Sequence, residues 1–548
     1  MEGLWMGDRR FLWGVVCVVV FAFALRVVPL LWSPLPFNPD GIKYAALVRD
    51  TLTSGDFPVA RMATDEFGFT AFLAVASSLV GVDPLVVAQP VSAAVGASTV
   101  LVGALLAERT ARRLDLSDSR TCSAALLAGL VLAMEGIYLF RSIPTDEQTV
   151  GLLLAPVVVV AVDRWLVTGR AAWAAVGVAV AIVIPPLHNL TGLVTVLAVA
   201  ILAVLAVRRQ PTRQTVIRAL LAALLTGGYV FGFHVGLDAI SAARIVQADR
   251  LVRVTDLFLA WTVLGIAGTV WYVTTSSRIR QGVVFAVGTV GFGLVALNAV
   301  RPVFPGTTTT PGPLLLRLLA LAVPVLLTGL VVDALADDRS PEYATLALVI
   351  APLVVVATGL TARLTFDYLA LLFRAHLFVH LPVLALAAVA VVAVGRERRR
   401  WLQVGVVLAL VLSVAVTVPV AYAGLELLNF DPVTTEAEFD ATDYAAAQFG
   451  TWTTDDLGVR LTTYHGGNAS EGPAFRWIQG GPPPDCPVVS QLSWTTTGAQ
   501  FYPRSPAVVS PERYAEWRAT NDVVYVTTSP DPVSIVVPPA YSGGGCRR

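Results

Sequence analysis

The sequence predicts an α-helical protein that crosses a lipid bilayer about thirteen times and ends in a small mixed α/β domain. Three observations lead to this fold class. The 548 residues are 56% hydrophobic and only 14% charged, whereas soluble domains carry roughly 25% charged residues. Apolar runs long enough to cross a membrane recur through residues 1–424. From residue 425 onward the chain is more polar and contains short β-type runs.

The candidate spans are defined by length, because a helix needs about 20 mostly apolar residues to cross the hydrocarbon core. Phe67–Gly81 is shorter and favours a helix that lies at the interface or re-enters the membrane. The thirteen predicted spans are residues 11–32, 85–107, 122–141, 148–166, 171–187, 190–207, 217–236, 256–275, 281–300, 313–334, 343–361, 377–394 and 401–423.

The arginine distribution predicts the orientation of these spans. If Phe67–Gly81 is not a span, 19 arginines fall in the inner connectors and about ten basic residues in the outer loops. Basic residues favour the cytoplasmic side, so we expect a cell-membrane protein with a cytoplasmic N-terminus, a long outer loop at 33–84 and an extracellular domain at 425–548. The inner arginines are Arg9, Arg10, Arg109, Arg112, Arg113, Arg120, Arg164, Arg170, Arg208, Arg209, Arg213, Arg218, Arg278, Arg280, Arg339, Arg396, Arg398, Arg399 and Arg400.

The C-terminal domain shows strand and disulfide patterns. Val523–Thr527 and Val533–Val537 are bounded by Pro and Gly and are typical of strands. Cys486 and Cys546 both fall in this domain, and a disulfide between them is expected if the domain is extracellular. The domain has no excess of basic residues, so a nucleic-acid partner is not expected.

Acidic side chains gather in the first two outer loops. Asp40, in Pro36-Phe37-Asn38-Pro39-Asp40-Gly41, is either a turn or helix-cap residue or a catalytic carboxylate, with Lys43 close behind it. Asp146 and Glu147 either begin the next helix, whose N-terminal dipole favours acids, or orient a substrate or a divalent cation.

Cationic groups lie near the same predicted boundary. Arg363 and Arg374 suit phosphate recognition, although arginines that only fix helix depth would show the same pattern. His188 suits a site role or an interfacial structural role, and the five histidines lack zinc-ligand spacing. Arg26 and Glu135 lie within spans and are either paired with each other or in contact with a cavity.

The order of features in the first 170 residues resembles the polyprenyl-phosphate-sugar-dependent glycosyltransferases of the GT-C fold, the branch with protein mannosyltransferases and lipid A aminoarabinose transferase. Asp65-Glu66-Phe67 departs from that family, which often has a Pro-Pro-Leu or His-Pro motif there, so acceptor contacts differ. The matching residues, in chain order, are Arg26, Asp40, Tyr44-Ala45-Ala46, Ser78-Leu79-Val80-Gly81, Glu108-Arg109, Arg141 and Asp146.

The resemblance implies a hexosyltransferase, most similar to archaeal dolichyl-phosphate-mannose-dependent mannosyltransferases of surface N-glycan assembly. Asp40 then takes the role of catalytic base on a glycan or glycoprotein acceptor. Asp146, with Glu147, lies near the donor phosphate or a metal, Mg²⁺ or Mn²⁺, which the reaction does not strictly need. The residues expected to contact substrate are Arg26, Lys43, Arg141, His188, Arg363 and Arg374.

Three other functions remain open at the level of sequence. An oligosaccharyltransferase has a similar plan, but its Trp-Trp-Asp-Tyr-Gly motif is absent, and no Trp-Trp pair occurs in the chain. A lipid-linked oligosaccharide flippase or transporter would favour charged residues deep in the spans, whereas the acids here gather in outer loops. A surface-assembly protein without catalysis is the third option.

Overall fold

The computed structural model describes residues 9–241, 248–336, 342–394, 400–543 and 545–546. Four of the predicted inner arginines, Arg339, Arg396, Arg398 and Arg399, lie outside these ranges.

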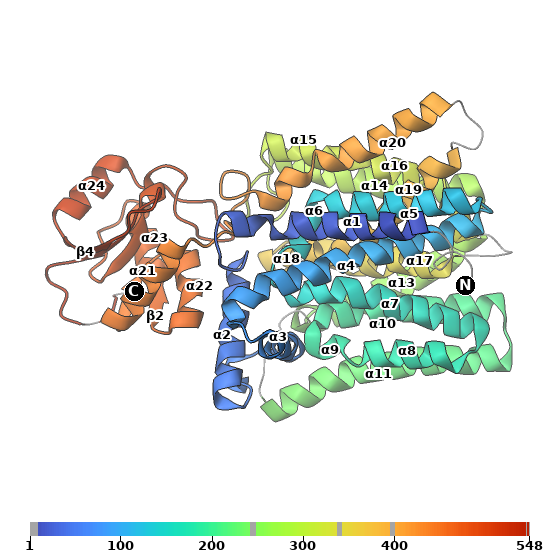
Figure 1. Cartoon of the computed structure of the whole chain (residues 1–548), viewed down its shortest axis with the longest axis horizontal. Coiled ribbons are helices and arrows are strands. Elements are labelled where there is room, and N and C mark those ends of the chain that lie inside the picture. Colours follow the sequence, from blue (N-terminus) through green and yellow to red (C-terminus); the bar gives the residue numbers. More distant parts are fainter. Residues whose placement is uncertain (1–8, 242–247, 337–341, 395–399, 544, 547–548) are drawn as a thin grey trace.

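Helices make up the described chain from Arg9 to Ala415 (Figure 1). They are α1 (Arg9–Val27), α2 (Pro39–Ser54), α3 (Phe67–Val80), α4 (Pro84–Arg113), α5 (Asp118–Met134), α6 (Gly136–Ser142), α7 (Glu147–Thr168), α8 (Ala171–Ala181), α9 (Ile184–Leu187), α10 (Asn189–Arg209), α11 (Arg213–Ser241), α12 (Ala248–Val252), α13 (Thr255–Thr274), α14 (Ser277–Val300), α15 (Gly312–Ala320), α16 (Ala322–Thr328), α17 (Tyr343–Thr361), α18 (Phe366–Ala375), α19 (Leu377–Val394) and α20 (Arg400–Ala415).

The helices confirm the predicted fold class of a multi-pass membrane protein. Within the described residues, ten helices are long and apolar enough to cross a membrane, and α5 with α6, bent by 70°, makes an eleventh candidate. The predicted spans 171–187 and 313–334 coincide with shorter apolar helices, so the count of thirteen stays a prediction. α3 is short, as Phe67–Gly81 predicted, and ends where Gly81 adopts a φ of 69°, which glycine tolerates best.

The helices differ in how much of their apolar surface the protein itself covers. In the most apolar 18-residue stretch of α10, 72% of the residues are buried. The corresponding share is 17% in α13 and 0% in α14. Apolar residues exposed over a whole helix indicate contact with lipid. α10 therefore lies in the core of the bundle, and α13 and α14 present their apolar side chains to the membrane.

The C-terminal region contains one mixed sheet with the strand order β2-β1-β3-β5-β4. β1 pairs in parallel with β2 and β3, whereas β5 pairs antiparallel with β3 and β4. Two strands were predicted: β5 has the predicted bounds, and β4 begins one residue earlier than expected. The elements are α21 (Glu436–Gln448), β1 (Thr451–Thr453), α22 (Asp456–His465), β2 (Asn468–Ser470), α23 (Gly472–Ile478), β3 (Val488–Gln491), α24 (Pro511–Ala519), β4 (Asp522–Val526) and β5 (Val533–Val537).

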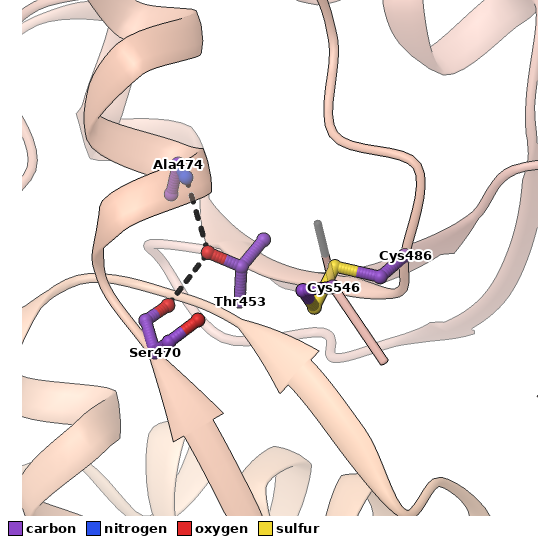
Figure 2. The surroundings of a disulfide bond; sticks show 5 residues. All are labelled: Thr453, Ser470, Ala474, Cys486 and Cys546. Carbon is purple, nitrogen blue, oxygen red and sulfur yellow. Dashed lines mark hydrogen bonds between the residues drawn. A yellow bond between two sulfur atoms is a disulfide. The ribbon is translucent and has the colours of Figure 1, made fainter. Parts of the chain in front are cut away.

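A disulfide joins Cys486 to Cys546, so it ties the end of the described chain to the segment before β3 (Figure 2). Beside it, the Thr453 hydroxyl donates to the Ser470 carbonyl at 2.6 Å and accepts from the Ala474 amide at 3.0 Å. These bonds join β1 to β2 and to the start of α23. The disulfide therefore lies beside a group of elements, β1, β2 and α23, that hydrogen bonds already hold together.

The C-terminal sheet and its helices lie at one end of the bundle, and α2 runs across that end (Figure 1). α22 packs against α2 along its length. Arg49 and Arg61 donate to the Tyr464 and Thr463 carbonyls at 3.0 and 2.7 Å. The Asn38 amide donates to the Pro432 carbonyl at 2.7 Å. The first outer loop therefore forms the contact surface between the bundle and the C-terminal domain.

Candidate active site

The first outer loop places Asp40 in the first turn of α2. Asn38, with a φ of 86°, is the cap residue, and its side chain accepts from the Asp40 amide at 3.2 Å. Sequence reasoning left a cap role open for Asp40, but Asn38 holds that position. The Asp40 carboxylate instead lies 3.7 Å from the Arg460 guanidinium of α22. It is half-buried between the bundle and the C-terminal domain.

The second outer loop places an acid pair at the start of α7. The Asp146 carboxylate caps this helix by accepting from the Gln148 amide at 2.9 Å. The Glu147 side chain is buried, accepts from the Tyr44 hydroxyl and lies 3.9 Å from the Arg374 guanidinium. The helix-start interpretation thus holds for Asp146. It does not account for Glu147, whose carboxylate turns toward α2 and α18.

Gly41 lets the first and second outer loops pack closely, because it has no side chain. A Cβ on Gly41 would lie 2.6 Å from the Pro36 Cβ and 2.9 Å from the Thr145 Cβ, closer than real Cβ atoms come. Any residue other than glycine at position 41 would therefore push α2 away from the second loop. Gly41 keeps Asp40 beside the acid pair of α7.

Asp65, from the connector between α2 and α3, and His188, from the connector between α9 and α10, lie beside each other. The Asp65 carboxylate accepts from the Asn189 amide at 3.4 Å, and burial raises the pKa of Asp65 to about 6. His188 caps α10 through its Nδ1 atom, which accepts from the Thr191 amide at 3.3 Å. Burial lowers the pKa of His188 to about 3, so the imidazole is neutral at physiological pH. His188 is thus a helix cap that lies beside the acids.

Arg374, near the end of α18, lies within electrostatic range of these acids. Its guanidinium interacts electrostatically with four carboxylates, those of Asp146, Glu147, Asp40 and Asp65. The Gln148 side chain donates to the Arg374 carbonyl at 2.9 Å and holds α18 against the start of α7. Opposite charges that meet away from bulk water interact more strongly than they do at a free surface.

Lys43 and Arg141 complete the charged cluster. Lys43 donates to the Glu66 carboxylate and interacts electrostatically with Asp40. Arg141 interacts electrostatically with Arg374, Asp146 and Asp40. In this part of the described chain the cluster therefore holds three cations and five carboxylates. The charged groups of the cluster are Asp40, Lys43, Asp65, Glu66, Arg141, Asp146, Glu147 and Arg374.

Two predicted substrate-contacting residues lie apart from this cluster. Arg26 is fully buried, donates to the Ser142 hydroxyl at 2.7 Å and thereby joins α1 to α6. It is not paired with Glu135, which contacts His380 at 2.8 Å. Arg363 is exposed in the connector between α17 and α18 and does not join the described cluster.

Sequence reasoning missed three charged residues of the site: Asp65, Glu66 and Arg460. One signal was available, because Asp65-Glu66 precedes the apolar helix α3 just as Asp146-Glu147 precedes α7. Two acid pairs at the starts of apolar helices could have been grouped. Nothing in the sequence connects Arg460 with Asp40 across more than 400 residues.

The described residues do not fit a resident metal ion in this arrangement. Among them, no three His, Cys, Asp or Glu side chains come together as metal ligands. Instead Glu66 takes a hydrogen bond from Lys43, Glu147 takes one from Tyr44, and Asp146 caps α7. Hard cations need several free oxygen ligands, and one oxygen of each of these three carboxylates already has another partner.

Comparison with solved structures places the arrangement of the chain among known folds. An oligosaccharyltransferase from Archaeoglobus fulgidus in the apo form has 13% sequence identity and a TM-score of 0.50, covering 90% of this chain and 71% of its own. The same protein tethered to an acceptor peptide with an NVT sequon has 12% identity and a TM-score of 0.50, covering 98% and 75%. The fold is GT-C-like. No protein-family model and no curated protein matches the sequence.

A second solved structure shares the length of the chain more than its detailed shape. ArnT from Cupriavidus metallidurans in the apo state has 17% identity and covers 96% of this chain and 98% of its own, with a TM-score of 0.34. The likeness in fold rests on the oligosaccharyltransferase structures, and identities of 12% and 13% show nothing finer than the fold. The chemistry of this chain must therefore be argued from its own residues.

Proposed function

We propose that this chain is a membrane glycosyltransferase that moves a sugar from a polyprenyl-phosphate donor to an acceptor hydroxyl at the outer face. One observation carries the proposal. The Arg374 guanidinium interacts electrostatically with carboxylates from the first two predicted outer loops, and one of these, Asp40, lies 3.7 Å from Arg460 of the C-terminal domain. A lipid phosphate held in the membrane and an acceptor from the aqueous side can meet at such a boundary. The GT-C-like fold supports this class of chemistry by analogy.

The proposed reaction is a displacement at the anomeric carbon of the donor sugar. Asp40 takes the proton of the acceptor hydroxyl while the acceptor oxygen bonds to that carbon. The bond between the carbon and the phosphate oxygen breaks, and the lipid phosphate leaves with the electron pair. Asp40 suits the role of base because its carboxylate is half-buried and is not used as a helix cap.

Cations of the cluster are proposed to hold the donor phosphate. Arg374 provides a guanidinium, which matches phosphate oxygens in pairs, and Arg141 and Lys43 add positive charge nearby. Asp146 and Glu147 are proposed to orient Arg374. These cations are already in position to stabilise the negative charge that develops on the leaving phosphate.

Arg363, Arg26 and His188 are proposed to serve the donor less directly. Arg363 is exposed in the connector ahead of α18 and would meet the lipid phosphate at the membrane surface. Arg26 is buried and joins α1 to α6, and His188 is buried and caps α10. Since a lipid phosphate is already a good leaving group, no step of this proposal requires a metal.

The resemblance in the first 170 residues supports finer assignments. We propose that the sugar is mannose, the donor is dolichyl or another polyprenyl phosphate, and the acceptor is a glycan or glycoprotein in protein N-glycosylation. The enzyme is then a hexosyltransferase. An oligosaccharyltransferase from Archaeoglobus fulgidus has been described with dolichol-phosphate and an inhibitory peptide, so a lipid carrier phosphate is compatible with this fold.

The orientation of the chain in the membrane is also a proposal. Residues 1–424 form the membrane part and residues 425–548 lie outside the cell, because the inner connectors contain the excess of arginine. The start of α1 and the C-terminal domain lie at opposite ends of the bundle (Figure 1), which agrees with an odd number of crossings.

The surface glycan of a deletion strain tests the function against its rivals. A transferase of this kind adds one sugar, so the glycan mass should fall by a single hexose. Loss of the entire glycan would instead indicate a flippase or an oligosaccharyltransferase. The flippase is disfavoured because the acids of the site gather at the end of the bundle and are not distributed through its spans.

A further inference from the structure

A cavity lies where α2 meets the C-terminal domain. Its volume is about 370 Å³, and it is open to solvent on one side. Six residues from α2, α21 and α22 line it: Arg49, Phe439, Asp440, Asp443, Tyr464 and His465. None of them belongs to the charged cluster around Arg374, so the cavity has no role in the displacement step.

His465 gives this cavity a buried polar atom without a protein partner. The His465 side chain is only 5% exposed, and its Nδ1 atom lies 2.9 Å from the Asp443 carboxylate. Burial lowers the pKa of His465, so the ring is neutral and donates its Nδ1 proton to Asp443. The Nε2 atom is then an acceptor, and it has no hydrogen-bond partner in the described protein. A buried acceptor of this kind needs a donor from a ligand or water.

Aromatic rings form the inner wall of the cavity. The Phe439 ring centroid lies 4.2 Å from that of His465 and 5.2 Å from that of Tyr464. The Arg49 guanidinium lies 4.3 Å from the centre of the Tyr464 ring, which fixes both side chains. Asp440 and Asp443 are exposed at the rim. The cavity thus combines packed rings with charged and polar groups, which make up most of its accessible lining.

We infer that this cavity binds a neutral oligosaccharide, namely the inner sugars of the acceptor glycan, an inference that rests on the proposed function. Sugars present apolar C–H faces and a dense array of hydroxyl donors. The aromatic wall suits the faces, while Asp440, Asp443 and the Nε2 atom of His465 suit the hydroxyls. Two carboxylates beside one arginine leave net negative charge, which disfavours acidic sugars. Arg49 already forms an ion pair with Asp50 at 3.2 Å, so its positive charge is partly neutralised.

The distance between the cavity and Asp40 agrees with a role in acceptor binding. Arg49 follows Asp40 by nine residues on α2, which corresponds to about 14 Å along the helix axis at 1.5 Å per residue. α22 runs beside α2 in the same sense, because Arg460 lies near Asp40 and Tyr464 lies near Arg49. A short oligosaccharide seated in the cavity can therefore extend along these helices and present its terminal hydroxyl to Asp40.

Binding of labelled trisaccharides to the full-length protein in nanodiscs tests the inference. The neutral set is mannotriose, cellotriose and N-acetylchitotriose, and the acidic probe is trigalacturonate. At least one neutral trisaccharide should bind, and trigalacturonate should bind more weakly. Asp443→Ala should weaken binding by about tenfold, the value of one hydrogen bond to a charged group. Asp522→Ala, an exposed acid on β4 outside the cavity, should leave it unchanged.

The transfer reaction separates this inference from the proposed function. Asp443→Ala should raise KM for the acceptor without changing kcat, whereas Asp40→Asn should bind trisaccharide as the wild type does. Trisaccharide binding that depends on Asp443, in a protein without any transfer activity, would support the cavity and refute the proposed function. If no neutral trisaccharide binds, or if Asp443→Ala and His465→Ala both bind as the wild type does, the inference is wrong. The Asp443 side chain is 70% exposed, so its removal should not unfold the domain.

Discussion

Replacement of Arg460 by alanine should slow sugar transfer while leaving the charged cluster of the bundle intact. Arg460 is the residue by which the C-terminal domain contacts Asp40, at 3.7 Å. It is held by Asp456, whose carboxylate accepts from the Arg460 Nε atom at 2.9 Å. Its removal should let the Asp40 carboxylate adopt other rotamers. Arg460 is thus a positioning residue for the proposed base.

The size of this effect follows from the separation and exposure of the pair. Two unit charges about 4 Å apart attract by about 1 kcal/mol in water and by more in a less polar medium. The two side chains are 31% and 38% exposed, so the lower value applies. Since 1.36 kcal/mol corresponds to a factor of ten, Arg460→Ala should lower kcat/KM by roughly fivefold. Arg460→Lys keeps the charge and should recover part of that loss.

Sugar transfer from a polyprenyl-phosphate donor, measured with equal amounts of each variant in membranes, provides the assay. Arg518→Ala, on α24 in the same domain and beside Tyr514, is the matched control and should transfer normally. In the Asp40→Asn background, Arg460→Ala should have little further effect, because both changes act through one carboxylate. Full additivity of the two changes, or normal transfer by Arg460→Ala alone, would refute this reasoning.

Three further predictions concern the C-terminal domain. Protease added to intact cells should remove residues 425–548, and cleavage only after lysis would contradict the proposed orientation. Cys486 and Cys546 should resist thiol labelling until reductant is added, and labelling of either one in the folded, unreduced protein would exclude the disulfide. Burial raises the pKa of Asp455 to about 6, so the folded domain binds a proton more tightly than the unfolded chain. Its stability should therefore fall as pH rises from about 4 to about 6, and hydrogen exchange of α22 should show a smaller fall in Asp455→Asn.

The membrane helices could be predicted from sequence because uninterrupted apolar runs have few alternatives. The break between α5 and α6 could not, since it depends on Glu135, whose side chain accepts from the Ile137 and Tyr138 amides and caps a new helix. β1 and β2 are three residues long and show no pattern of their own. They pair only because the chain around them folds, so periodicity could not reveal them.

The candidate site was predictable only in part. Asp40, Asp146 and Glu147 stand out because acids in outer loops beside apolar spans are unusual. Their common partner, Arg374, lies more than 200 residues further along the chain. From the sequence alone, Arg374 could equally be an arginine that only fixes the depth of its helix in the membrane. The pairing of Tyr44 with Glu147 and of Lys43 with Glu66 depends on how α2 crosses the end of the bundle. Such contacts between distant segments need a structure.

Sugar transfer by Asp40→Asn tests the central claim most directly. Asparagine keeps the size of the side chain, and Asn38 remains the cap of α2, so the fold should survive. Loss of a general base typically costs about 10² to 10⁴ in rate. Asp146→Asn should also impair transfer. Asp115→Asn, in the connector between α4 and α5, should transfer normally. The fold should tolerate this change, because asparagine readily adopts the φ of 51° at that position. We expect Asp40→Asn membranes to bind the polyprenyl-phosphate donor but transfer almost no sugar. Transfer near the wild-type rate would remove Asp40 from the site and contradict the proposed mechanism.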